Sequence, residues 1–398
     1  MKMKNTKYLF AIIVILGLFS CKSEIFKHKT LGKSGDISKF LQTKESKPLA
    51  QVYFEHGNFV NSRMFPPIIK NTEVYANQMD YLIIDLRKAD DYEQGHINGA
   101  YNVPMKDVID FLKNKRKASS VEKVVFVCYT GQKASYTTGI TRYAGFDNTY
   151  VMLFGMAGWN AEFSGPLKKA FGDISDKSLL EIAKGEHKTD GEEHHASVEH
   201  EEHKAIDWSK FPLLEKGSFS MISEKRAKEL LSLKRPEFLV SKGELVDNLK
   251  KNIDYYYPLA YMSKKQFDYA HIKGAHQYTT RKDLSPDHKL AEVAKDKPVL
   301  VYCKTGHTAA NATAYLKMLG YDSKSLILGS SAIMQSLWAQ QGWQVRDVSA
   351  LISDLPVVRG KKRTNSNPFL AKATKKKSGG APKPIVRRKK KEVSGGCG

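Results

Sequence analysis

Two cysteines, Cys128 and Cys303, stand in the same local sequence. Each ends a short apolar run, and each is followed three residues later by a glycine, which permits a tight turn. The N–H groups of such a turn, and the positive end of a helix that follows it, can converge on one sulfur. The pattern therefore predicts nucleophilic thiolates with a lowered pKa. A free cysteine is often only a small buried apolar side chain, but the repetition argues against that interpretation.

The elements expected to position these cysteines alternate between strand and helix. We expect strands at 81–86, 124–127, 151–154, 299–302 and 325–328, and helices at 134–143 and 309–319. The strand segments are short and rich in β-branched and aromatic residues, whereas Gly145 and Gly320 end the helices. Such alternation predicts a parallel sheet with helices on both faces. Both cysteines then fall at carboxyl ends of strands, where α/β sheets bind ligands.

The chain also contains an internal repeat with a constant offset of 175 residues. His96-Ile-Asn-Gly-Ala recurs as His271-Ile-Lys-Gly-Ala, and the same offset separates Cys128 from Cys303. A constant offset over this length indicates two copies of one fold. The two histidines are predicted to brace the fold through hydrogen bonds rather than to bind a metal or catalyse.

Several segments resemble the motifs of the rhodanese-like (thiosulfate sulfurtransferase) family. The segments that carry this resemblance are 84–87, 95–100, Cys128-Tyr-Thr-Gly-Gln-Lys133 and 155–159 in the first copy, and Cys303-Lys-Thr-Gly-His-Thr308 in the second. The resemblance covers about 60–165 and, more loosely, 215–345. It implies an α/β fold of two rhodanese-like domains, each a parallel sheet with helices on both faces.

The resemblance implies a sulfurtransferase that carries a sulfane sulfur as a persulfide on Cys128 and Cys303. A small anionic donor, such as thiosulfate or a persulfide, would supply the sulfur, and a thiol or cyanide-like acceptor would take it. No cofactor and no metal is expected. The substrate-binding loops would consist of Tyr129, Thr130, Gly131, Gln132 and Lys133 in the first copy, and of Lys304, Thr305, Gly306, His307 and Thr308 in the second. Lys133 and His307 can supply positive potential for an anionic donor.

The second copy departs from the family's pattern near its cysteine. At the offset of 175 residues, Asp85 corresponds to Ala260 and Arg87 to Met262. The resemblance implies that Asp85 and Arg87 support the fold beside the loop. We therefore expect Cys128 to carry most of the activity, and the second copy to be less active or purely supporting.

Two other functions remain open. Related domains whose loop is one residue longer act as phosphatases or arsenate reductases. The first copy places six residues from Cys128 to Lys133 before the expected helix start at Ala134, which favours a sulfur atom over a larger phosphate group. The other alternative is a catalytically silent module that uses the fold for protein contacts or metal delivery.

The N-terminus resembles the export signal of a bacterial lipoprotein. Three lysines precede an apolar run at 8–19, which is shorter than the ~20 residues of a membrane span. Ser20-Cys21 then ends the run as in a lipobox. The resemblance implies removal of residues 1–20, lipidation of Cys21, and a lipid-anchored protein of the bacterial cell envelope, periplasmic or outer-membrane associated.

Positive charge is concentrated at the C-terminus. Residues 359–398 hold 14 Lys and Arg against one Glu, so they carry +13 of the net +22 and leave +9 for the other 358 residues. Such a tail favours anionic surfaces, so we expect it to assist membrane adhesion, without a specific nucleic acid partner. The expected divisions are signal peptide 1–20, N-terminal extension 21–59, first domain 60–165, Glu- and His-rich linker 166–212, divergent second domain 213–348, and basic disordered tail 349–398.

Overall fold

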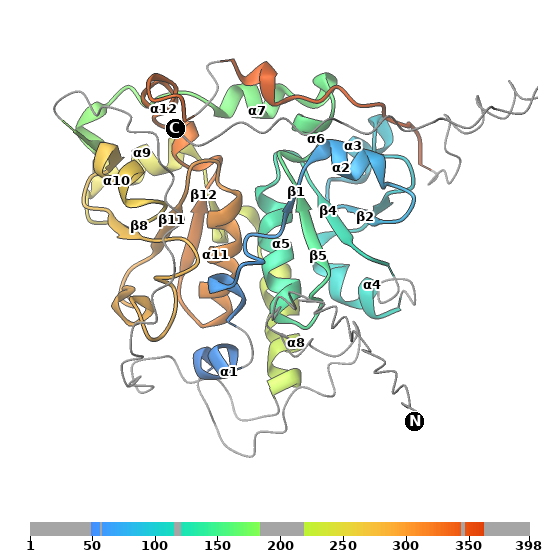
Figure 1. Cartoon of the computed structure of the whole chain (residues 1–398), viewed down its shortest axis with the longest axis horizontal. Coiled ribbons are helices and arrows are strands. Elements are labelled where there is room, and N and C mark those ends of the chain that lie inside the picture. The colour runs from blue at the N-terminus through green and yellow to red at the C-terminus, as the bar shows by residue number, and fades with distance from the viewer. Residues whose placement is uncertain (1–48, 56–57, 115–120, 184–218, 344–346, 362–398) are drawn as a thin grey trace, which may run out of the picture.

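The computed structural model describes residues 49–55, 58–114, 121–183, 219–343 and 347–361 as two α/β domains side by side (Figure 1). The predicted lipidation site Cys21, most of the Glu- and His-rich linker and residues 362–398 lie outside the described residues. None of the helices in the described ranges has the length and apolarity of a membrane span.

The first domain is built on a five-stranded parallel sheet. In spatial order its strands are β1 (Ile68–Ile69), β5 (Thr149–Met152), β4 (Val124–Val127), β2 (Leu82–Asp85) and β3 (Tyr101–Asn102). The two central strands, β4 and β2, are buried at every position, as a sheet covered on both faces requires. The helices of this domain are α2 (Asn71–Ala76), α3 (Ala89–Gln94), α4 (Val108–Asn114), α5 (Gln132–Tyr143), α6 (Gly155–Trp159) and α7 (Gly165–Ala170).

The second domain repeats this sheet with the same strand order. Its strands are β7 (Leu239–Val240), β12 (Ser323–Leu326), β11 (Val299–Tyr302), β8 (Tyr257–Tyr261) and β10 (His276–Tyr278), all parallel to their neighbours. The pairing of Asp85 with Val127 recurs as the pairing of Ala260 with Tyr302, which confirms the offset of 175 residues. The helices are α8 (Phe219–Leu231), α9 (Lys242–Lys251), α10 (Lys264–Tyr269), α11 (His307–Met318) and α12 (Gln335–Gln340).

The strands that carry the cysteines, β4 and β11, lie where the sequence predicts them. The strands expected at 151–154 and 325–328 each end two residues earlier, because Phe154 and Leu328 adopt left-handed conformations that turn the chain away. Both cysteine loops are also followed by helix sooner than expected. Because α5 begins at residue 132 and α11 at residue 307, the last two residues of each six-residue loop are helical.

The domains meet through α5 and α11, which pack against each other between the two sheets (Figure 1). Gly139 permits this close approach, since a Cβ there would lie 2.6 Å from the Cβ of Ala314. Helix α1 (Leu49–Glu55) packs at the same junction, where the ring of Tyr53 contacts those of Tyr143 and Tyr315. Part of the expected N-terminal extension therefore belongs to the shared core.

Each domain also sends its C-terminal segment to the other domain. Strand β6 (Leu180–Ile182), which follows the first domain, pairs antiparallel with β9 (Ala270–Ile272) of the second. Reciprocally, Val358, which follows the second domain, pairs antiparallel with His96 of the first. Residues 172–182 of the expected linker and 353–360 of the expected tail thus contact the opposite domain. Composition did not indicate this, because the partners of these segments are far away in the sequence.

Candidate active site

Both cysteines lie at the carboxyl end of a central strand and directly before a helix. The N–H groups of Gly131 and Ala134 lie 3.2 and 3.4 Å from the Sγ of Cys128. In the second domain the N–H of Ala309 lies 3.4 Å from the Sγ of Cys303. Each loop turns at its glycine, which has a left-handed φ that other residues rarely adopt. The predicted convergence of N–H groups on each sulfur is therefore present.

The thiols themselves are covered. The side chains of Cys128 and Cys303 are 2% and 6% exposed, and burial raises the pKa of both. The backbone N–H groups around each sulfur lower its pKa, but by less than desolvation raises it. The predicted lowering of the thiol pKa is therefore wrong for this structure, because the sequence pattern shows the hydrogen-bond donors and not the loss of water.

A fixed amine distinguishes the first site from the second. The Nζ of Lys133 donates a hydrogen bond to the carbonyl of Leu86 at 2.6 Å, and the positive charge of Lys133 lowers the pKa of Cys128. Burial lowers the pKa of Lys133, whereas the nearby Cys128 raises it. The corresponding residue of the second loop, Thr308, offers its hydroxyl to Cys303. Cys128 therefore has a cationic neighbour where Cys303 has a neutral one.

Asp85 and Arg87 form a buried ion pair at the end of β2. The carboxylate of Asp85 accepts hydrogen bonds from the Nη2 of Arg87 at 2.7 Å and from its Nε at 3.1 Å. The Nη2 also donates to the carbonyl of Gly95 at 2.6 Å. The pair thus connects the strand end beside Leu86 and Lys133 to Gly95, which directly precedes the His96 motif. Ala260 and Met262 replace it in the second domain.

Other loop side chains bond to protein groups. The hydroxyl of Tyr129 donates to the carboxylate of Asp91, and burial raises the pKa of Tyr129 to about 12. The hydroxyl of Thr130 donates to the Oε1 of Gln132 at 2.6 Å. In the second loop, the Nζ of Lys304 donates to the carbonyl of Trp343 at 3.1 Å. These bonds hold the loop residues in defined positions around the sulfur.

His307 does not supply the positive potential expected of it. Its side chain is fully buried between the domains, and its Nε2 accepts a hydrogen bond from the backbone N–H of Phe154 at 3.0 Å. Burial lowers the pKa of His307 to about 4, so the ring is neutral at neutral pH. The sequence pattern placed His307 in a loop, but it could not show that the other domain covers this loop.

His96 and His271 brace the fold as predicted. The Nδ1 of His96 lies 2.8 Å from the carbonyl of Tyr92, and that of His271 lies 2.8 Å from the carbonyl of Phe267. Each imidazole also stacks on the aromatic ring of the same partner, at 3.6 and 3.8 Å between centroids.

The turns after β5 and β12 hold the backbone carbonyls of the two cysteines, and the sequence motif did not indicate this role. The N–H of Met156 donates to the carbonyl of Cys128 at 2.9 Å, and that of Ser330 donates to the carbonyl of Cys303 at 2.8 Å. A side chain at Gly155 would overlap with the carbonyl of Cys128. Gly155, which begins the segment 155–159, was the sequence signal for this contact, because a glycine allows two backbones to approach closely.

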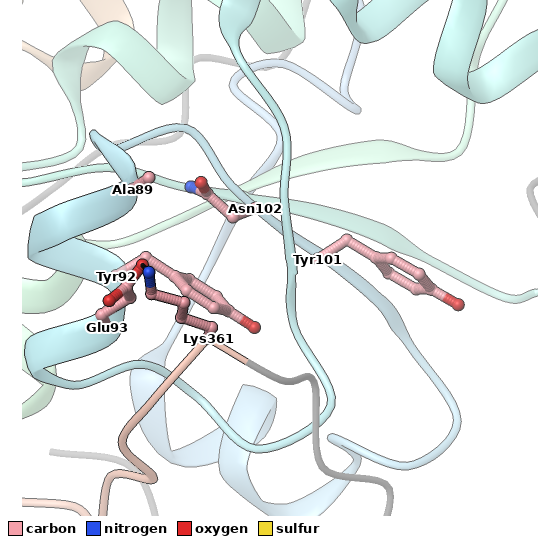
Figure 2. Close-up of a pocket in the computed structure, with 6 residues that line it drawn as sticks. All are labelled: Ala89, Tyr92, Glu93, Tyr101, Asn102 and Lys361. Atoms are coloured by element: carbon pink, nitrogen blue, oxygen red, sulfur yellow. Dashed lines mark ion pairs between the residues drawn. The ribbon is translucent and has the colours of Figure 1, made fainter.

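A pocket of about 280 Å³ lies at the outer edge of the first domain. Its lining consists of Ala89, Tyr92, Glu93, Tyr101, Asn102 and Lys361 (Figure 2). The Nδ2 of Asn102 donates at 3.0 Å to the carbonyls of Asp85 and Arg87. The pocket therefore adjoins the end of β2, but no residue of the Cys128 loop lines it.

Comparison with known proteins finds two matches to one family. The model of the rhodanese-like domain matches residues 70–162 and 245–335. The thiosulfate sulfurtransferase GlpE of Pseudoalteromonas translucida is 26% identical over 96 residues, which cover 24% of this chain and 89% of that protein. A solved structure of a probable thiosulfate sulfurtransferase is 16% identical and covers 70% of this chain and 97% of its own, with a TM-score of 0.25.

Two further relatives are uncharacterized proteins. YibN of Escherichia coli is 28% identical over 86 residues, which are 22% of this chain and 60% of YibN. A protein of Buchnera aphidicola is 29% identical over 86 residues, which are 22% of this chain and 58% of that protein. The chain thus spans less than two thirds of the length of these two relatives.

Proposed function

This chain contains two rhodanese-like domains, and from that premise we propose that it is a sulfurtransferase that carries a sulfane sulfur on Cys128. Relatives named thiosulfate sulfurtransferase support this family of activities. The observation that carries the proposal is the convergence of the N–H groups of Gly131 and Ala134 on one sulfur, with the amine of Lys133 nearby. Such a site stabilises an anionic sulfur species.

The proposed reaction has two displacement steps. First, the thiol of Cys128 loses its proton to solvent, and the thiolate attacks the sulfane sulfur of thiosulfate. A bond forms between these two sulfur atoms, and sulfite leaves with the electron pair of the bond that breaks. In the second step, a thiolate or cyanide attacks the outer sulfur of the persulfide. The Cys128 thiolate then leaves with its electron pair, so the protein returns to its starting state.

The persulfide is the species that the loop would stabilise. Its negative charge rests on the outer sulfur, and the donors around Cys128 are oriented before the reaction begins. The raised pKa of Cys128 means that only a minor fraction is thiolate at neutral pH. Sulfur loading should therefore accelerate as the pH rises toward the thiol pKa.

A catalytically silent binding module is the second candidate. Two observations favour it, namely the burial of both thiols and the raised pKa that burial gives them. This candidate predicts that neither cysteine accepts sulfur from thiosulfate or from a small persulfide. The two candidates therefore differ in one measurable product.

Mass spectrometry of the full chain after exposure to thiosulfate tests the proposal. We expect the mass of one added sulfur on the peptide that contains Cys128, and we expect it to vanish on treatment with cyanide. Cys128→Ser is the matched control and should leave that peptide unmodified. A chain that stays unmodified at both cysteines would support the silent module, whereas turnover of phosphate esters without sulfur loading would support a phosphatase.

We also propose that the chain is anchored to the bacterial cell envelope through a lipid on Cys21. The proposal rests on the Lys-rich start, the apolar run and the Ser20-Cys21 pair. Expression in a bacterium with a clickable fatty acid should label the full chain, and Cys21→Ala should lose the label. Persistence of the label in Cys21→Ala would contradict the assignment.

The basic tail is proposed to add membrane adhesion. Each Lys or Arg close to an anionic membrane contributes on the order of 1 kcal/mol, which salt screens. The chain without residues 1–21 should bind anionic vesicles in low salt and release them in high salt. Truncation after Lys361 keeps the contacts of Arg359 and Gly360 with the first domain. This truncation should weaken vesicle binding and preserve sulfur transfer; the opposite pattern would assign the tail to the reaction.

A further inference from the structure

The two cysteine loops contact each other across the domain interface, and the contact is not symmetric. Gln132 and His307 occupy equivalent positions, 175 residues apart, at the start of α5 and α11. The Nε2 of Gln132 donates a hydrogen bond to the carbonyl of Thr305 at 3.1 Å. The imidazole of His307 instead enters the first domain and lies against Gly131.

The imidazole of His307 fills a space in the first domain that has no counterpart in the second domain. A Cβ added to Gly131 would overlap with the Nε2 of His307. A Cβ added to the equivalent Gly306 would lie 2.9 Å from the backbone nitrogen of Leu328, so in the second domain the loop packs directly on the turn after the strand. In the first domain that turn is at Phe154, and the imidazole contacts both the loop and the turn.

The hydrogen bonds of His307 determine its tautomer. The N–H of Phe154 donates to the Nε2 at 3.0 Å, so this nitrogen carries no proton. The Nδ1 lies 3.1 Å from the carbonyl of Thr305, which can only accept, so the proton is on Nδ1. The ring of Phe154 meets the imidazole edge-on at 5.1 Å between centroids. Both ring nitrogens are thus paired in a fully buried position.

Two series of contacts connect His307 to Cys128, one through Gly131 and one through Phe154. Gly131, which touches the imidazole, directs its own N–H to the Sγ of Cys128 at 3.2 Å. Phe154, which donates to the imidazole, has a left-handed φ of 56° that a residue with a side chain adopts only when its surroundings hold it. Two residues later, the N–H of Met156 holds the carbonyl of Cys128.

We propose that His307 of the second domain is a positioning residue for Cys128 of the first domain. Its neutral imidazole holds Gly131 and Phe154 at the separation that directs the loop N–H groups to the sulfur. The second domain therefore contributes to the first site through this side chain, independently of any reaction at Cys303. This inference rests on the proposed function of Cys128 as the sulfur carrier.

Two substitutions separate the hydrogen bond of His307 from the space that it fills. His307→Gln keeps an oxygen that can accept from the N–H of Phe154, and glutamine is also the residue at the equivalent position of the first loop. His307→Leu fills a similar volume but leaves this N–H without an acceptor. The rate of sulfur loading on the Cys128 peptide, followed by mass spectrometry with thiosulfate, should fall roughly 10-fold or more in His307→Leu. His307→Gln should retain most of the rate.

A histidine of the same domain provides the matched control. His276 lies in the edge strand β10 and stacks on Tyr257 at 4.2 Å, without a contact to the Cys128 loop, so His276→Phe should leave Cys128 loading unchanged. Thermal unfolding of each variant verifies that it is folded. Equal loading in wild type and His307→Leu would overturn the inference, as would equal losses in the leucine and glutamine variants. Absence of loading in the wild type would instead overturn the proposed function.

A measurement on the wild-type chain decides the inference even where His307→Leu does not fold. Nitrogen NMR of the full chain labelled with ¹⁵N-histidine, assigned through His307→Gln, reports which ring nitrogen carries the proton. We expect a protonated Nδ1 and an unprotonated Nε2 at neutral pH. A proton on Nε2 would remove the acceptor for Phe154 and would overturn the inference.

Discussion

The first domain has charged groups beside its cysteine, whereas the second has an uncharged hydroxyl at the equivalent position. Beside Cys128 lie the amine of Lys133 and, one strand away, the buried Asp85–Arg87 pair. At the equivalent place beside Cys303 lies the hydroxyl of Thr308. The backbones nevertheless agree in strand order, in register and in the left-handed glycine of each loop. The shared fold thus does not require these charges, and the two sites differ in the side chains beside the sulfur.

A side-chain amide bonds to the backbone at the end of β2 and at the end of β8, although only the first domain has the ion pair. The amide of Asn102 donates to the carbonyl of Arg87 at 3.0 Å, and the amide of Gln277 donates to the carbonyl of Met262 at 2.9 Å. Because this bond uses the backbone of residue 87 or 262, it does not depend on the side chain there. The end of β8 in the second domain therefore keeps this contact without the charges of the first domain.

The largest difference between the domains should appear when each cysteine is removed. Cys128→Ser should lower thiosulfate sulfurtransferase activity roughly 1,000-fold, because a hydroxyl is a poor substitute for the nucleophilic thiolate. Cys303→Ser should retain more than about half of the activity, since its site lacks the cationic neighbour. Steady-state rates of both variants test this ranking, and a greater loss in Cys303→Ser would reverse it.

The ion pair of the first domain can be converted into the residues of the second. Asp85→Ala alone leaves the buried Arg87 without its partner and should lower the free energy of unfolding by about 3 kcal/mol. The double variant Asp85→Ala, Arg87→Met reproduces the second domain's pair and should cost less than the single one, because no buried charge remains. Urea unfolding measures both. A double variant less stable than Asp85→Ala would show that the charges themselves stabilise the fold.

A smaller effect is expected from exchanging the residues beside the two sulfurs. Lys133→Thr removes the positive charge that lowers the pKa of Cys128, so the thiol pKa should rise further. Because thiolate is the reactive form, the pH profile of Cys128 alkylation should move to higher pH, and the rate at pH 8 should fall about 3-fold to 10-fold. Thr308→Lys should move the profile of Cys303 in the opposite direction. Unchanged pH profiles in both variants would show that Lys133 does not cause the difference in reactivity between Cys128 and Cys303.

The sequence by itself determined the two copies, their cysteine-bearing strands and the turn after each cysteine. These features follow from local patterns, since β-branched runs form strands and the following glycine turns the chain toward a helix. The braces of His96 and His271 were accessible for the same reason, because each contacts a carbonyl only four residues away.

Only the tertiary structure decided the ionisation of the site and the folding of the connecting segments. The pKa of Cys128 rises because other elements exclude water from it, and no local pattern records that exclusion. His307 is neutral because packing against the first domain buries its ring, and burial lowers its pKa to about 4. Residues 180–182 of the expected linker pair with a strand of the opposite domain, and Val358 of the expected tail pairs with His96 of the first domain. Each of these outcomes depends on contacts between residues that are distant in the sequence, and such contacts exist only once the two domains have packed together.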